Sequence, residues 1–362
     1  MVQGVIESFG LDQISVDFAM GTNERETLMI ERVSGIATLI EKLGILAETP
    51  LDSAFVKAIP KDAIFARLFA LNVVEPYDRL VAFLEGRQPE AVEDLRRFEA
   101  EIGLNVRDDL LAPLSGRFAM YSSNTTGGGI LSTVMIVELT DPATMNQTLS
   151  SFEAMFNAEM GRETDEYLQF VTSEDRGIRY DTLRTPGLPF PLELTFTISD
   201  RYLIVGASPQ SVRAAVEQAL SGADSLLDAP GFRAGLGGAS LDGSYSVGWF
   251  DTPELLTAGY GTAGLLTAAL SNMMRSPREP GRAPTFILPS FHDLERGVSP
   301  MVALTTYKDG VSDTVTRADR SQLVNLTGMA GSIYRTPFGL WVLLNAGAQS
   351  FDERDLEEVF DF

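Results

Sequence analysis

The residue types that most often carry catalysis are scarce in this chain of 362 residues, which has no cysteine and one histidine, His292. Without cysteine there is no thiolate nucleophile, no disulfide framework and no Cys-ligated zinc or iron–sulfur site. Ser290, His292 and Asp293 are the residue types of a hydrolytic triad, but a triad needs side chains that converge beside an oxyanion hole. Closeness in sequence does not provide that convergence, so we expect His292 to be a surface or helix-capping residue.

A glycine-rich stretch, AGLGGAS, contains Gly235, Gly237 and Gly238. Glycines let backbone N–H groups approach a phosphate, which is how nucleotide-binding turns work. Here no strand precedes the stretch, Ser240 stands where the dinucleotide fingerprint has its third glycine, and no Lys-Ser or Lys-Thr pair is present. We therefore predict a plain loop.

Acidic side chains gather at the C-terminus, FDERDLEEVFDF. A calcium loop would need a glycine turn and a bidentate glutamate in register, and this stretch lacks that pattern. Arranged as a helix, residues 351–362 place four apolar side chains near one face: Phe351, Leu356, Val359 and Phe360. We predict an amphipathic terminal helix that packs on the core or on a partner rather than a metal site.

Pairs of carboxylates elsewhere could support glycoside hydrolysis, which requires two well-spaced acids. The chain has 50 acidic residues, so its sequence selects no pair. A glycan site would also need aromatic platforms, for which Trp249 and Trp341 are the candidates. The sequence thus nominates no catalytic, cofactor-binding or metal-binding residue.

The balance of 50 acidic against 28 basic residues gives a formal net charge of −22. Such a chain repels a phosphate backbone, and its basic residues form no run of five or more, so we expect no nucleic-acid partner. The 44% hydrophobic content is that of a folded protein with an acidic surface. A chain of this length favours two domains or one extended domain of repeated units.

A junction in which a β-rich run leads through a proline into a helix recurs four times, at Pro76, Pro142, Pro209 and Pro253. Proline fits the first helical position because it lacks the N–H that would go unpaired there, and a preceding Asp or Ser caps the helix. Apolar residues spaced by three or four then predict one buried stripe per helix. The stripes comprise Tyr77, Leu80, Val81 and Leu84; Met145, Leu149, Phe152 and Phe156; and Val212, Ala215, Val216 and Ala219, with Gly222 closing the third helix.

Short turns between β-rich runs predict hairpins and therefore antiparallel pairing. The paired runs are ISVDFAM with ETLMIER, SGRFAMYSS with ILSTVMIVEL, LQFVTSE with GIRYDTL, ELTFTIS with RYLIVGA, and MVALTTY with VSDTVTR. We predict an α+β fold of antiparallel sheets with helices packed on one face, built from repeated strand–Pro–helix units.

Further helices are expected from Val33 to Leu43, from Pro89 to Ile102, and in a short segment from Asn105. The second should bury Val92, Leu95, Phe98 and Ile102, and Gly103 ends it. We divide the chain into an α+β module of residues 1–112, a second of residues 113–250, and a segment 251–362. The last comprises a helix, a proline-rich excursion from Arg275 and the strands that complete the fold.

The uncharged run from Leu255 to Met274 approaches membrane length, but its threonines and glycines lower its hydropathy below that of an ordinary span. We predict no membrane span in this chain. A protein partner or self-association is expected through Leu255–Met274 or through the C-terminal helix.

Two stretches, IPKDAIFARLFALN and FEAEIGLNVRDDLLAPLSGRFAMY, resemble an uncharacterised family of bacterial extracytoplasmic proteins. In that family a strand, an Asp-Pro helix as at Asp141–Pro142, a strand like YLIVGA and a Ser-Pro helix follow in the same order. The resemblance covers about residues 55–256 and rests on apolar and turn positions. It implies a protein in the periplasm or at the cell surface, of unknown activity. Family members usually begin with a signal or membrane anchor, which we do not find at Met1, so a cytoplasmic location stays open.

Three functions follow from these observations. We rank first a non-enzymatic extracytoplasmic module that binds a ligand or has a structural role, because the units repeat and no catalytic constellation is found. A subunit of a larger surface assembly, homo-oligomeric or with other chains, comes second. A carboxylate-dependent hydrolase acting on glycans comes third, and it predicts two buried acids about 5 to 9 Å apart in a groove.

Overall fold

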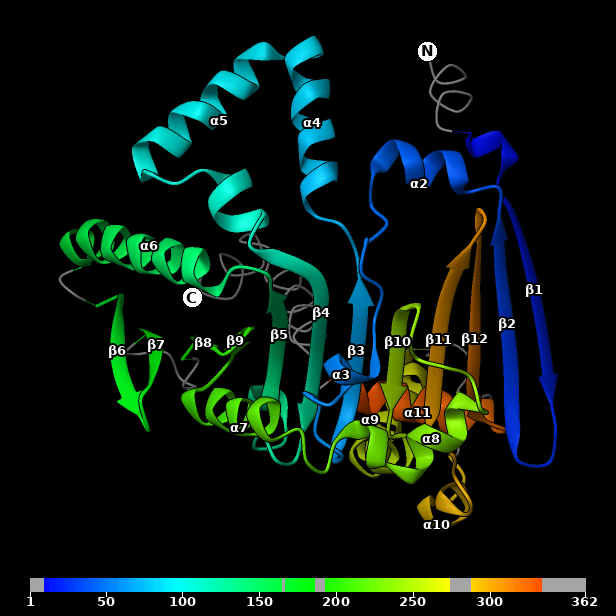
Figure 1. Cartoon of the computed structure of the whole chain (residues 1–362). Helices are drawn as coiled ribbons and strands as arrows, with labels where there is room; N and C mark the ends of the chain where they lie inside the picture. The colour runs from blue at the N-terminus through cyan, green and yellow to red at the C-terminus, as the bar shows by residue number, and fades with distance from the viewer. Residues whose placement is uncertain (1–9, 165–166, 186–192, 274–287, 334–362) are drawn as a thin grey trace, which may run out of the picture.

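The structure is a computed structural model of the chain, and it describes residues 10–164, 167–185, 193–273 and 288–333. Twelve strands of these residues form one antiparallel sheet in the order β1-β2-β12-β11-β10-β3-β4-β5-β9-β8-β7-β6 (Figure 1). The strands are β1 Ser15–Thr22, β2 Glu26–Ser34, β3 Ala63–Ala70, β4 Leu114–Ser123, β5 Thr133–Leu139, β6 Gln169–Asp175, β7 Ile178–Arg184, β8 Thr195–Ser199, β9 Tyr202–Gly206, β10 Ser244–Phe250, β11 Met301–Lys308 and β12 Val311–Asp319.

Helices connect and cover these strands. They are α2 Ala37–Leu43, α3 Ser53–Val56, α4 Val74–Arg87, α5 Pro89–Ile102, α6 Pro142–Glu163, α7 Pro209–Ser221, α8 Pro230–Leu236, α9 Thr252–Met273, α10 Phe291–Glu295 and α11 Gln322–Ile333. Short helical turns are η1 Leu11–Gln13, η2 Val106–Leu111, η3 Ile130–Ser132 and η4 Leu226–Asp228. The predicted α+β class with antiparallel pairing is confirmed.

All five predicted hairpins are present, and each pairs neighbouring strands of the sheet. Residues with positive φ occur in several of these turns, among them Asp200 at 52° and Asp309 at 51°, which Gly310 follows at 79°. Asp and Gly tolerate this left-handed backbone, which tight hairpin turns require. The strands of the three predicted chain segments interleave in the one sheet, since β3 lies between β10 and β4. The segment boundaries stay a prediction.

The main core lies on one face of the sheet, beneath α3, α7 and α8. Phe55, Tyr121 and Phe232 are fully buried there, and Trp249 packs edge-on against Phe232 with ring centroids 5.8 Å apart. At the β6 end, α6 covers the opposite face of the sheet. The ring centroids of Phe156 in α6 and Phe170 in β6 lie 5.1 Å apart there. A smaller cluster joins α9, α10 and α11 through Leu256, Leu294 and Val324.

The predicted helix caps are largely present. Asp141 Oδ1 accepts bonds from the N–H groups of Ala143 and Thr144 at 3.1 and 3.0 Å, and Ser208 caps α7, which Gly222 ends at φ 58°. Two helix starts differ from the prediction. Val33 lies in β2, so α2 begins at Ala37, and α4 begins at Val74, two residues before Pro76, because Asn72 Oδ1 accepts from the Val74 and Glu75 N–H groups.

The prediction of a plain loop at AGLGGAS is wrong for its first half. Gly235 lies inside α8, and a Cβ there would come within 2.3 Å of Val302 Cγ2, so only glycine lets the helix lie this close to β11. Gly237, at φ 60°, ends the helix in the left-handed conformation. These glycines serve helix packing and capping.

Within the described ranges, no helix combines the length and the apolar character needed to cross a membrane. The predicted interface segment from Leu255 forms most of α9, which lies beside α11. Leu255 and Leu256 are buried, whereas Leu265 is exposed. The predicted C-terminal helix, Trp341 and most of the proline-rich excursion lie outside the described residues.

Candidate binding surface

Three helical elements, α4, α5 and η2, connect the central strands β3 and β4 and project beyond the ends of these strands (Figure 1). We call residues 74–111 the arch. The chain leaves the sheet at Ala70 and returns at Leu114, so both ends of the arch are anchored on neighbouring strands. The arch is therefore held at a fixed place but is free of the sheet's hydrophobic core.

Ion pairs connect the three elements of the arch. Arg107 of η2 forms two bonds to Asp78 of α4, Nε to Oδ1 at 2.6 Å and Nη2 to Oδ2 at 2.9 Å. This paired hydrogen bonding holds the pKa of Asp78 below its usual value and raises that of Arg107. Arg96 of α5 donates to Glu85 of α4 at 2.6 Å. Forked guanidinium–carboxylate contacts of this kind fix geometry more than they stabilise an exposed surface.

A further hydrogen bond joins α5 to η2, the last element of the arch. Glu99 Oε1 accepts a bond from the Val106 N–H at 2.9 Å and lies 3.5 Å from the Tyr77 hydroxyl. Partial burial, with Glu99 nearby, raises the pKa of that hydroxyl above its usual value. Tyr77 thus remains a neutral hydrogen-bond donor at physiological pH.

The arch leaves large apolar side chains in solvent. Leu80, Phe83 and Phe98 are 55%, 54% and 52% exposed, and Val92 is the one buried residue of α4 and α5. The predictions that Leu80 belongs to a buried stripe and that Phe98 is buried are therefore wrong. The physical reason is that two helices standing off a sheet bury only the surfaces that face each other.

Three hollows surround the base of α4, with volumes of about 340, 390 and 280 Å³. The first two share Glu75 as a wall, and the second and third share Asp78. The hollows therefore follow one another along α4. All three combine carboxylates with apolar walls, and arginines line the first and the third.

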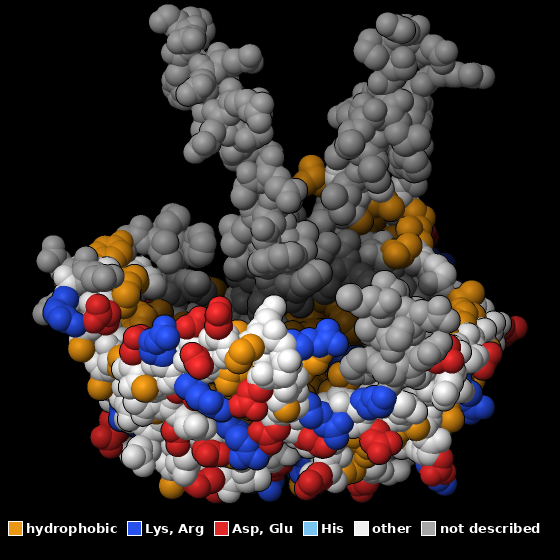
Figure 2. Space-filling view, turned by 90° about the horizontal axis from the view of Figure 1, so that it is seen from above, with side chains coloured by type: hydrophobic (Ala, Val, Ile, Leu, Met, Phe, Trp, Pro, Cys, Tyr) orange, Lys and Arg blue, Asp and Glu red, His pale blue; other side chains and the backbone are white. Residues whose placement is uncertain are grey.

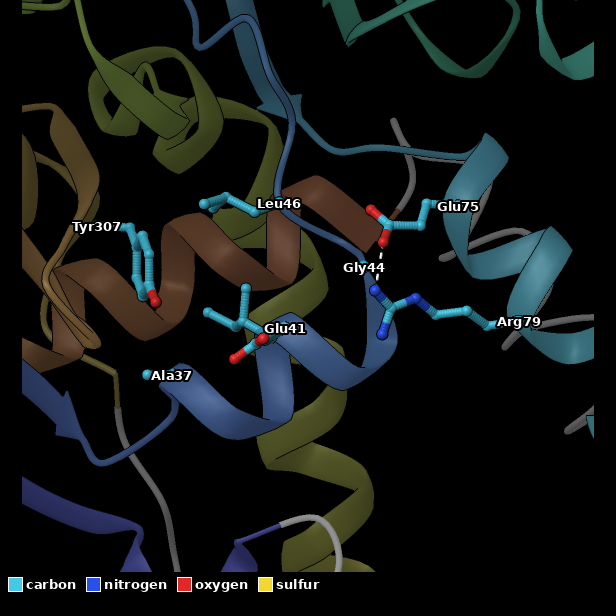
Figure 3. A pocket seen from close by; sticks show the side chains of 8 residues that line it. Ala37, Glu41, Gly44, Leu46, Glu75, Arg79 and Tyr307 are labelled. Carbon is cyan, nitrogen blue, oxygen red and sulfur yellow. Dashed lines mark hydrogen bonds and ion pairs between the residues drawn. The ribbon is translucent and has the colours of Figure 1, made fainter.

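Figure 3 shows the hollow between α2 and α4. Glu75 and Arg79 of α4 form an ion pair on one side, and Tyr307 of β11 stands on the other with Glu41 between them. Gly44 ends α2 at φ 65°, and a Cβ at this residue would lie 2.5 Å from Glu75 Cγ. Glycine is favoured here mainly because it tolerates the left-handed backbone that ends α2.

The charge of the arch is acidic. Residues 74–102 contain eight acidic and four basic residues, a formal net charge of −4. Seen from above, arginine and acidic side chains alternate on the surface with apolar side chains among them (Figure 2). Leu80, Phe83 and Phe98 place large apolar side chains among these charges, and this exposed apolar area is what makes the arch a candidate binding surface.

A separate cluster brings two acids together beneath α6. Glu153 of α6 and Asp181 of β7 are 6% and 5% exposed and are hydrogen-bond neighbours. Arg179 Nη2 contacts Glu153 Oε2 at 2.5 Å, and Arg179 Nε contacts Asp181 Oδ1 at 2.9 Å. Thr172 donates to the same Asp181 oxygen at 2.6 Å. Burial, and then repulsion from Asp181, raises the pKa of Glu153 to about 7 despite the arginine.

This carboxylate pair has the burial that a glycosidase needs but not the space. The adjoining cavity measures about 30 Å³, roughly the share of liquid volume of one water molecule, and a sugar ring does not fit. The two acids touch each other, whereas glycosidase acids stand roughly 5 to 9 Å apart around the substrate. The cluster ties α6 to the sheet, and we assign it a structural role.

Of the candidates from the sequence, Ser290 and Asp293 are hydrogen-bonded at 2.6 Å at the start of α10, but His292 forms a hydrogen bond with neither of them. The His292 side chain is 76% exposed, and its Nδ1 lies 3.1 Å from Glu295 Oε1 of the same helix. Ser290 caps α10 by accepting from the Asp293 N–H. Trp249 is wrong as a glycan platform, because it is 3% exposed and donates its indole N–H to the Ala63 carbonyl at 2.6 Å.

Across the described ranges, no three His, Asp or Glu side chains converge as ligands for a metal ion. Sequence reasoning missed the arch as a surface, although one signal was present: seven of the 14 residues of α5 are charged. Comparison with known proteins gives no further guide, since no family profile, curated protein or solved structure matches this chain.

Proposed function

We propose that this chain is a non-enzymatic binding module located outside the cytoplasm, and that the arch is its recognition surface. The observation that carries the proposal is the exposure of Leu80, Phe83 and Phe98 on helices held in place by ion pairs. Exposed apolar side chains on a fixed support lose little entropy on binding. The extracytoplasmic location rests on the sequence resemblance.

The chemistry of the arch favours a basic, amphipathic polypeptide segment of a partner protein. Apolar side chains of such a segment would cover Phe83 and Leu80, and its cations would face the net charge of −4 on α4 and α5. We further propose that the recurrent strand–Pro–helix junctions are a structural repeat that supports this surface. The predicted interfaces at Leu255–Met274 and the C-terminal helix remain secondary proposals for assembly.

Panning a peptide library displayed on phage against the purified chain tests the proposal. We expect enrichment of basic sequences with apolar residues at helical spacing, and loss of that enrichment when Leu80, Phe83 and Phe98 are all changed to serine. The matched control is Leu220→Ser on α7, because Leu220 is equally exposed at 55%. Enrichment that survives the triple substitution, or the absence of any enrichment, would contradict the proposal.

A polysaccharide panel tests the hydrolase alternative separately. We expect no turnover by the wild-type chain. Turnover that disappears in Glu153→Gln would show that the carboxylate pair acts chemically and that the proposed binding role is wrong.

A further inference from the structure

The strand β1 forms one end of the sheet (Figure 1). It presents a row of apolar side chains to solvent. Val16, Phe18 and Met20 are 61%, 63% and 58% exposed. They alternate along the strand, so all three side chains stand on the same face. A long edge strand with an exposed apolar row is a template for pairing with another strand.

The hairpin fixes which backbone groups of β1 point outward. The Asn23 N–H donates to the Glu26 carbonyl at 3.0 Å, so Asn23 and Glu26 form a hydrogen-bonded pair. Such pairs alternate along an antiparallel ladder, and the register places Ala19 opposite Ile30 in the hydrogen-bonded set. The N–H and C=O groups of Val16, Phe18 and Met20 therefore point away from β2. Among the described residues, none hydrogen-bonds to them.

Charge also favours a strand of like composition at this edge. From Ser15 to Thr22 the single charged residue is Asp17. It stands opposite Arg32 of β2, which in turn forms a fork with Asp313 of β12 at 2.7 and 3.0 Å. Arg32 offsets one of these two carboxylates, so this edge carries little charge of its own, although the whole chain has a formal net charge of −22.

We propose that β1 pairs antiparallel with β1 of a second copy of this chain, about a two-fold axis at Phe18. This register sets Phe18 opposite Phe18 of the second copy and Val16 opposite Met20 of the second copy. The outward N–H and C=O groups then face one another, so every apolar side chain of the row meets an apolar partner. This interface is independent of the arch.

The neighbouring registers fit less well. A shift toward the start of the strand sets Asp17 opposite Asp17 of the second copy, where like charges repel. A shift the other way sets Val16 opposite Thr22 of the second copy and loses one apolar contact. A one-residue slip brings outward groups against inward ones and breaks the ladder.

The dimer should be weak and should tighten with salt. A single strand pair buries less than about 1,200 Å² in total, the range of transient complexes. Two chains of −22 repel each other, and salt screens that repulsion. A basic partner on the same edge would respond in the opposite way, since salt weakens attraction between unlike charges.

The absence of native cysteine makes disulfide trapping a clean test. In the proposed register Asp17 and Ala19 of the second copy form a non-hydrogen-bonded pair with Cα atoms about 4.5 Å apart, a separation that a disulfide spans. We therefore expect Asp17→Cys chains, mixed with 15N-labelled Ala19→Cys chains and oxidised, to form mostly mixed dimers. Random collision gives mixed and like pairs in statistical proportion, which Ser173→Cys on β6 calibrates.

The other outcomes distinguish the alternatives. Disulfides formed only between two Asp17→Cys chains, or only between two Ala19→Cys chains, would show one of the shifted registers. Mixed and like dimers in statistical proportion would show no specific pairing. Each of these results overturns the proposal.

Light scattering supplies a second readout without cysteine. We expect Phe18→Lys to weaken the dimer by about tenfold or more and Ser173→Lys, at the opposite edge, to leave it unchanged. A wild-type chain that stays a monomer at all concentrations and salt levels contradicts the proposal, whatever the arch binds.

Discussion

The two ends of the sheet are built differently. At the β6 edge, the side-chain amide of Asn157 in α6 accepts a bond from the Phe170 N–H at 2.7 Å and donates to the Phe170 carbonyl at 3.0 Å. Asn157 thus occupies the place that a neighbouring strand would take. At the β1 edge, no described residue bonds the outward backbone groups, and apolar side chains stand in solvent.

This difference shows how one sheet can block pairing with a further strand at one edge and permit it at the other. Acidic side chains, a covering helix and a side-chain amide prevent further pairing at β6, which are recognised ways to protect an edge. Among the described residues, the β1 edge has neither a covering helix nor a side-chain amide on its outward backbone groups, and Asp17 is its one charged side chain. Substitutions at the β6 end should therefore change mainly the stability of the monomer. Substitutions at the β1 end should change mainly the association of two copies.

The largest effect is expected from Arg179→Met, which leaves Glu153 and Asp181 in contact without their cation. The two acids are buried but the Arg179 side chain is 43% exposed, so solvent screening reduces the loss, and we expect the free energy of unfolding to fall by about 2–3 kcal/mol at pH 8. Part of the loss should return at pH 5, because Glu153 then takes up a proton. Denaturant unfolding at both pH values measures this. Arg176→Met is the control, since its pair with Glu217 is exposed and should be worth under about 1 kcal/mol.

Next comes Glu153→Gln, whose effect depends on pH. The folded pKa of Glu153, about 7, lies above its ordinary value of 4.5. Such a group stabilises the fold below about pH 4.5, and this contribution is lost as pH rises toward 7. Glutamine does not titrate. Between pH 4.5 and 7 the free energy of unfolding of the variant should therefore rise relative to that of the wild type by up to about 3 kcal/mol. A flat difference across this range would show that burial and the neighbouring Asp181 do not raise the pKa of Glu153.

Asn157→Ala opens the protected edge. Two hydrogen bonds to Phe170 are lost, so we expect a destabilisation of about 1–2 kcal/mol, measured by thermal unfolding. Gln147→Ala, an exposed change on the same helix, should have little effect. If the variant is as stable as the wild type, the amide does not serve as a substitute strand.

The smallest effects on stability are expected at the open edge. Phe18→Lys and Ser173→Lys should each change the free energy of unfolding of the monomer by less than about 0.5 kcal/mol, because both side chains are exposed. A large loss of stability in Phe18→Lys, measured at a concentration where the wild type is monomeric, would show that Phe18 belongs to the core of its own chain.

Local patterns predicted the elements well. Hairpin turns with Asp and Gly, the Asp141 and Ser208 caps and the closing Gly222 depend on neighbours in sequence, and the structure contains all of them. The interleaving of β10 and β3 depends on contacts between distant segments, so the sequence does not disclose it. Periodicity predicts an apolar stripe but not whether another element covers it.

The surfaces were missed for the same reason. Leu80 and Phe98 follow helical spacing and look like core positions, yet the arch stands away from the sheet. Val16, Phe18 and Met20 alternate as a half-buried strand should, yet β1 is the last strand of the sheet. Glu153 and Asp181 lie 28 positions apart and meet only because α6 folds over β7, so none of the 50 acids could be chosen in advance.

Residue-resolved amide exchange at two protein concentrations tests the central claim most directly. Ala19 and Gly21 donate within the β1–β2 hairpin, so their amides should be protected at both concentrations. The outward amides of Val16, Phe18 and Met20 should be protected at high concentration and exchange freely on dilution, while protection along β6 does not change. Outward amides that exchange freely even at high concentration, or that stay protected on dilution, would contradict pairing with a second copy.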